Sequence, residues 1–303
     1  MSGERRFWPA RTPRLYQELL YRRPGTGAAG ELTVTWFGTT CELISDGETA
    51  LLVDPFLTRT TGLLALAADR RTLRPDPSQY EHWVAPHRAP IAAMPVSHTH
   101  FDHILDAGVV GARTGATLLG SASSVVVGRS LGLPDAQLRV AEPGVPQRHG
   151  AFTVTFLPSK HSAGGQPTGD VVDLVPIPAR FRQLRQGGTF SVLIEHPAGS
   201  LLCHNSAGYL PGSLTGRAAV TVFLSAASPP ANLDAYLRET VDAVGAGRVF
   251  LVHWDDFTRP LHRPLRPIPV MVNLPGFVGQ LRRLRPGLAV HTLPIGEPQI
   301  VVD

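Results

Sequence analysis

Short hydrophobic runs, bounded by glycine, proline and turn-forming polar residues, recur along the whole chain. Two of them, 31–38 and 50–56, flank the turn-like segment SDGET and predict two β-strands. Residues 187–196 and 200–209 predict a hairpin whose turn includes PAGS. Further strands are expected at 89–100, 115–121, 152–161, 219–226, 248–257, 288–294 and 298–303.

Two segments have helical spacing instead. Residues 123–133 predict a short helix that ends at a glycine, and residues 232–246 predict a longer one. In the longer segment, Asn232 or Asp234 is expected to cap the first turn and Gly245 to end the helix. The chain mixes strands with helices, so we assign it to the α/β class.

Composition and charge narrow the class of protein. Of the 303 residues, 43% are hydrophobic and 17% are charged, which is typical of a globular domain. The net charge of +4 is spread along the chain, so no nucleic-acid partner is expected. No hydrophobic run approaches the roughly 20 residues of a transmembrane helix. The sequence predicts a basic N-terminal arm at 1–30 without the apolar core of a secretory signal, followed by one domain at 31–303.

The cysteine count excludes two kinds of site. Cys41 and Cys203 are too few for a disulfide framework, and neither lies in a C-x-x-C pair that would bind zinc through thiolates. With no sign of secretion, the expected compartment is the cytoplasm.

Histidines stand at the ends of three predicted strands. The segment SHTHFDH follows the first, His161 ends the second and His253 ends the third. Because chemistry is most often placed at strand ends and in the loops after them, we expect these side chains to converge on one rim.

The segment SHTHFDH has the spacing of a metal site. Alternate residues of an extended loop point the same way, so His98 and His100 are expected to bind one ion. Asp102 and His103 point elsewhere and can reach a second ion. Imidazole and carboxylate ligands suit zinc, our first choice, and also manganese, iron or cobalt.

Four motifs in this order resemble those of the metallo-β-lactamase-fold hydrolases, and most of all the branch related to ascorbate-6-phosphate lactonases. They are TWFGTTCELISDGETALLVDPFLT, SHTHFDH, LPSKHS and VFLVHWDDF. The resemblance runs from about Glu31 to the C-terminus and implies a four-layer αβ/βα sandwich. It also implies that His98, His100 and His161 bind a first metal ion, and that Asp102, His103 and His253 bind a second.

The sequence departs from the family pattern at one motif. A segment like G-D-[ST]-G-Y normally supplies an aspartate that bridges the two ions, but this chain reads CHNSAGY, with Asn205 in the aspartate's place. An amide is a neutral and poor zinc ligand, so the site holds one ion, or holds the second weakly. Alternatively, His204 replaces the missing ligand, or the segment is a strand end that only packs beside the site.

The expected mechanism is attack by a water molecule that a dication has made acidic. Asp102 is the candidate for orienting that water and moving its proton, while Asp54 either braces the histidine loop or caps a turn. The long segment 161–188 is a candidate lid, and its arginines either neutralise an anionic substrate or form a solvated face: Arg180, Arg182 and Arg185.

Three functions remain open on sequence grounds. The first is a metallo-hydrolase of a small ester, lactone, thioester or amide. The second is a phosphodiesterase, and the apolar GLLALAA at 62–68 is a weak sign of a lipid substrate. The third is a metal-binding protein with weak or non-hydrolytic activity, because the bridging carboxylate is replaced. The sequence names neither the substrate nor the oligomeric state.

Overall fold

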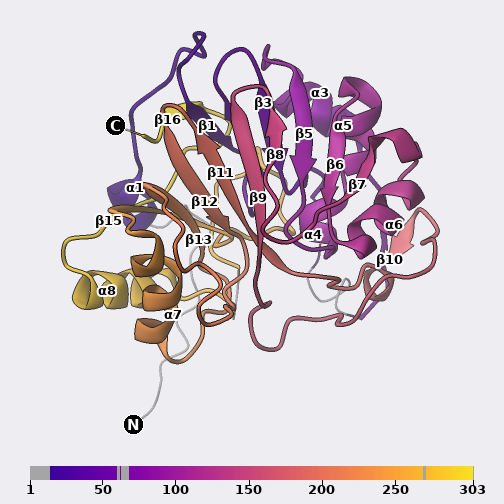
Figure 1. Ribbon diagram of the computed structural model, residues 1–303. Coiled ribbons are helices and arrows are strands. Elements are labelled where there is room, and N and C mark those ends of the chain that lie inside the picture. Colours follow the sequence, from indigo (N-terminus) through magenta and orange to yellow (C-terminus); the bar gives the residue numbers. More distant parts are fainter. Residues whose placement is uncertain (1–13, 60–61, 63–67, 269–270, 303) are drawn as a thin grey trace.

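Two seven-stranded β-sheets form the centre of the computed structural model, which describes residues 14–59, 62, 68–268 and 271–302. Helices cover the outer faces of the two sheets, giving the four layers of an αβ/βα sandwich (Figure 1). The expected fold class is confirmed. Central strands such as β13 (Thr221–Ser225) are buried along their whole length, because each sheet has the other sheet on one face and helices on the other.

The first sheet is antiparallel at one end and parallel at the other. Its strands pair in the order β16-β1-β2-β3-β5-β6-β7, and the last four run parallel. Their bounds are β1 Thr33–Trp36, β2 Glu42–Ser45, β3 Ala50–Val53, β5 Ile91–Pro95, β6 Thr117–Gly120, β7 Leu138–Val140 and β16 Gln299–Ile300.

The second sheet repeats this plan with the order β15-β14-β13-β12-β11-β9-β8, of which the first four strands are parallel. Its remaining bounds are β8 Gln147–His149, β9 Phe152–Pro158, β11 Phe190–His196, β12 Gly199–His204, β14 Arg248–Val252 and β15 Ala289–His291. The predicted hairpin is confirmed, with His196 paired to Gly199. A separate two-stranded sheet joins β4 (Thr72–Leu73) to β10 (Ala179–Arg180).

Helices follow the parallel strands. On the first sheet, α5 (Ala107–Thr114) and α6 (Ala122–Ser130) pack against β5, β6 and β7, and α6 confirms the first predicted helix.

The helix predicted at 232–246 is α7 (Leu233–Thr240) followed by η3 (Asp242–Val244). The Asn232 side chain caps its N-terminus, and Gly245 ends it with a left-handed φ. The sequence patterns did not predict α5, nor α3 (Pro77–Trp83), α4 (Phe101–Ile104) or α8 (Leu274–Leu284). The other short helices are η1 (Asp135–Gln137) and η2 (Phe181–Gln183).

The described part of the N-terminal arm, residues 14–30, packs against the C-terminal strands. Tyr16 and Leu19 of α1 (Arg14–Leu19) are buried, and the Tyr16 hydroxyl donates to the Leu293 carbonyl at 3.0 Å. No described helix is long and apolar enough to cross a membrane.

Candidate metal centre

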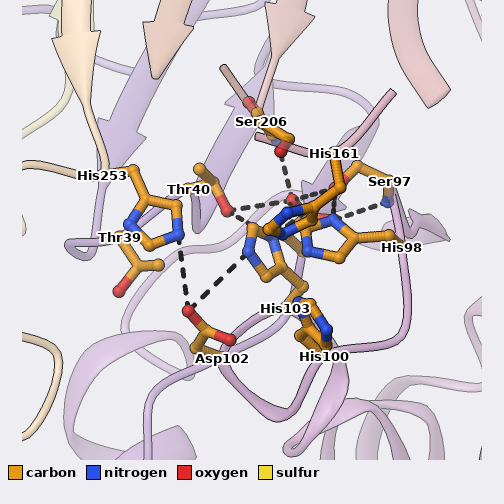
Figure 2. A network of polar contacts seen from close by, with 12 residues as sticks. Thr39, Thr40, Ser97, His98, His100, Asp102, His103, His161, Ser206 and His253 are labelled. Atoms are coloured by element: carbon orange, nitrogen blue, oxygen red, sulfur yellow. Dashed lines mark hydrogen bonds and ion pairs between the residues drawn. The ribbon is translucent and has the colours of Figure 1, made fainter. Parts of the chain in front are cut away.

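Six side chains form two adjacent groups at one edge of the sandwich (Figure 2). The segments after β5, β9 and β14 carry them, with Asp102 and His103 in α4, and this is the strand-end convergence expected from the sequence. Within each group the potential ligand atoms lie within 4.8 Å of one another: His98, His100 and His161 in the first group, Asp102, His103 and His253 in the second.

The three rings of the first group stand edge-on around one point. Ring centroids are 4.9 Å apart for His98 and His100, 4.8 Å for His98 and His161, and 4.7 Å for His100 and His161. Three imidazoles leave one position of a tetrahedral zinc open.

Protein partners orient these rings and leave ligand atoms free. Ser97 Oγ lies 3.1 Å from His98 Nδ1, and the Ser162 carbonyl lies 3.1 Å from His161 Nδ1. The Nε2 atom of His98 is buried and has no hydrogen-bond partner among the described residues. An imidazole held through one nitrogen presents the other to a metal ion.

The second group is built around His103, whose ring centroid is 3.8 Å from that of His98. Its Nδ1 lies 2.7 Å from Asp54 Oδ2 and 2.9 Å from Thr40 Oγ1. Its Nε2 is buried and forms no hydrogen bond with any described residue. Asp102 Oδ2 is 3.8 Å from that nitrogen and 3.4 Å from His253 Nε2. Oxygen and nitrogen ligands therefore face one another here.

Asp54 holds the second group in place through hydrogen bonds. Its Oδ2 accepts hydrogen bonds from Thr40, Ser97 and Asn205 as well as His103. Of the two alternatives drawn from the sequence, the structure places Asp54 as the brace of the histidine loop. Thr40 and Ser97 were missed, and only the position of Ser97 beside the histidine motif offered a signal.

Three non-glycine residues at this edge have left-handed backbone conformations. The φ angles are +51° for Thr39, +44° for Asp54 and +56° for His253. Such conformations cost free energy and gather at functional sites. The Thr39 carbonyl accepts from the His253 amide at 2.7 Å, so the two strained residues hold each other.

Burial keeps the first group neutral. It lowers the pKa of His98 well below the usual value and that of His161 to about 4, so both imidazoles can donate a lone pair near neutral pH. Burial acts to raise the pKa of Asp102, but the positive charge of His103 and the hydrogen bond from His253 lower it, so the carboxylate stays ionised.

Asn205 and His204 lie on opposite faces of the second sheet. The Asn205 amide is buried and donates to Asp54 Oδ2 at 2.8 Å, while its Oδ1 has no partner among the described residues. The His204 ring packs against Tyr236 of α7, with centroids 5.5 Å apart, and its Nδ1 lies 2.8 Å from Ser191 Oγ. Successive residues of a strand alternate between faces, so His204 cannot turn into the site without unpacking α7. Asn205 is the residue beside the two groups.

A cavity of about 340 Å³ opens over both groups. His100, Asp102, His161 and His253 form its floor, and residues 162–166 of the predicted lid segment line one side. None of the three lid arginines lines it; Arg180 instead donates to the Asp69 carbonyl at 2.7 Å. Most of GLLALAA, residues 63–67, lies outside the described residues.

The sequence of this chain is similar to those of known proteins. Residues 34–206 match the family model described as the Metallo-beta-lactamase superfamily. A UPF0173 metal-dependent hydrolase of Pyrobaculum arsenaticum is 25% identical over 143 residues, which cover 46% of this chain and 56% of that protein. A UPF0173 metal-dependent hydrolase of Anaeromyxobacter sp. is 28% identical over 165 residues, covering 48% and 53%. The chain thus spans about half the length of these curated relatives.

Solved structures share the fold. The metallo hydrolase Igni18 of Ignicoccus hospitalis superimposes with a TM-score of 0.54 at 16% identity, over 87% of this chain and 94% of that one. At such low identity the likeness concerns the fold alone.

Proposed function

The chain belongs to the metallo-beta-lactamase superfamily, and on that premise we propose that it is a metal-dependent hydrolase of a small ester, lactone, thioester or amide. One observation carries the proposal. The buried Nε2 atoms of His98 and His103 have no hydrogen-bond partner among the described residues, although these two histidines lie in two groups of convergent ligands. Burying such polar atoms unpaired is costly, and metal ions would satisfy them.

We propose zinc as the ion, held first by His98, His100 and His161. Three neutral imidazoles with an open fourth position are a catalytic zinc set. Asp102, His103 and His253 would hold a second ion, and Asn205 would face both. When bound, such an ion acts as a Lewis acid and makes water acidic enough to attack a carbonyl carbon near neutral pH.

Asp102 is our candidate for the proton transfer. Its carboxylate lines the cavity and stays ionised, so it can accept a hydrogen bond from the attacking water, orient it and take its proton. Before that transfer, the hydrogen bond from His253, whose Nε2 lies 3.4 Å from Asp102 Oδ2, would help to keep the carboxylate ionised; the transferred proton then neutralises it.

Elemental analysis of the purified chain, combined with a panel of chromogenic esters, lactones and phosphodiesters, tests this function. We expect bound zinc and metal-dependent turnover of an ester or lactone, with both lost in His98→Ala and His100→Ala. His82→Ala is the matched control, because His82 packs on Trp83 and does not line the cavity. Phosphodiester turnover alone, or bound metal with no hydrolysis of any substrate, would favour one of the two other functions over this one.

A further inference from the structure

An aromatic wall forms part of the lining of the cavity over the ligand groups. Phe101, Phe181 and Phe257 line it from three separate segments. The Phe101 ring stands edge-on to the other two, at centroid distances of 5.9 Å to Phe181 and 5.8 Å to Phe257. Edge-to-face rings at this spacing form a stable apolar surface.

This wall begins directly at the metal ligands. The Phe257 ring lies 5.8 Å from that of His253, and Phe101 is the residue between His100 and Asp102. Met271, 38% exposed, lines the same cavity and continues the apolar surface to its rim. Any group next to a bond held over the ligands would therefore contact phenyl rings.

Cationic side chains are missing from the described lining. It contains no lysine or arginine, and its one carboxylate is Asp102. Apart from the three histidines of the floor, the remaining polar side chains are neutral: the Gln166 amide and the hydroxyls of Ser162, Ser206, Ser225 and Ser228. An anionic group away from the reacting bond would lose much of its hydration here and gain no cationic partner, which is unfavourable.

We infer, on the basis of the proposed hydrolysis, that the non-reacting part of the substrate is uncharged and apolar, about the size of a phenyl or pentyl group. It would rest on Phe101, Phe181 and Phe257 while the scissile carbonyl lies over the ligand groups. A volume of about 340 Å³ is at the small end of ligand cavities and fits one such group plus the reacting centre.

Two esters that differ only at the end of the acyl chain test this. They are 4-nitrophenyl pentanoate and mono(4-nitrophenyl) glutarate, which share the leaving group and chain length but end in a methyl or a carboxylate. For the zinc-loaded protein we expect kcat/KM at least 30-fold higher for the pentanoate. A ratio below 3, or a preference for the glutarate, would overturn the inference.

Two variants show whether the cavity sets the ratio. Met271→Lys places an ammonium at the rim and should lower the ratio at least 5-fold, chiefly by raising kcat/KM for the glutarate. Val140→Lys adds the same charge on the exposed face of β7, where Val140 is 59% exposed, and should leave the ratio unchanged. Equal effects of the two lysines would mean that general charge, and not the cavity wall, governs selectivity.

Binding of two anilides, measured with a check for their turnover, separates this inference from the proposed function. If neither these esters nor any member of the substrate panel is turned over, the hydrolase proposal fails. The inference is then decided by the binding of pentananilide and N-phenylglutaramate, followed by NMR titration. We expect tighter binding of the neutral anilide, weakened at least 5-fold in Phe181→Ala; equal or tighter binding of the glutaramate would overturn the inference.

Discussion

Replacing Asn205 with aspartate would turn a hydrogen bond into a contact between two carboxylates. In the native chain the Asn205 amide donates to Asp54 Oδ2 at 2.8 Å, and both side chains are buried. The amide adds no charge beside the two ligand groups. Two dications there would repel each other without a shared anion, so we predict about one tightly bound ion per chain at the three-histidine group.

The size of the effect follows from the distance. Two unit charges 2.8 Å apart repel by about 6 kcal/mol at an effective dielectric constant of about 20. The lost hydrogen bond to a charged acceptor adds about 1.5–3 kcal/mol. The metal-free Asn205→Asp protein must therefore unfold more easily or bind a proton between the two carboxylates. A dication next to them reverses the sign of this interaction and favours a second ion.

Elemental analysis and thermal unfolding, each with and without a chelator, measure both consequences near neutral pH. We expect Asn205→Asp to raise the metal content from about one ion toward two, to lower the metal-free Tm, and to increase the Tm gained on adding zinc. Asn205→Ala is the control: it removes the hydrogen bond without adding charge, so it should lower the Tm and leave the stoichiometry unchanged.

Two results would refute this reasoning. Native protein that already holds two ions tightly would show that no bridging carboxylate is needed. An aspartate variant that keeps one ion would show that position 205 does not face the second ion. His204→Ala should leave the metal content unchanged, because the His204 ring packs under α7 against Tyr236; a loss of metal would favour His204 as a substitute ligand.

Three further predictions concern the histidines. His161→Ala should abolish tight zinc binding by elemental analysis, whereas His291→Ala, on a distant strand, should not. Gly165→Ala should weaken zinc binding at least tenfold in a competition titration, because a Cβ there would lie 2.0 Å from His161 Nδ1; Gly287→Ala, with no atom within 4 Å, is the control. Burial lowers the pKa of His204 from its usual value of about 6.5 to about 4. Between these two pH values the imidazole is protonated in the unfolded chain and neutral in the folded chain. The free energy of unfolding should thus fall by up to about 3 kcal/mol between pH 6.5 and 4 on this account, and His204→Gln should flatten that slope in urea titrations; an unchanged slope would contradict the assigned burial.

Local patterns were sufficient for most strands and for the histidines at their ends, but not for the short strands β2, β4, β7, β8 and β10. A strand shows its two-residue period and its bounding turns within eight or so residues, so β9, β11 and β12 could be placed from the sequence. The motif SHTHFDH is equally local, because its spacing alone separates His98 and His100 from Asp102 and His103. Short helices such as α4 escaped prediction, since four residues are too few to show a helical period.

Contacts between distant segments were decided only by the tertiary structure. The strand period requires Asn205 and His204 to face opposite ways, but only the tertiary packing determines that His204 packs against α7 and that Asn205 bonds to Asp54. Asp54 meets His103 across 49 residues of chain and Asn205 across 151. The aromatic wall likewise combines three segments with no common pattern. The periodicity of a sequence shows which residues of an element face the core and which face solvent. The contacts named here depend instead on which elements pack against one another, and the free energy of the whole core determines that packing.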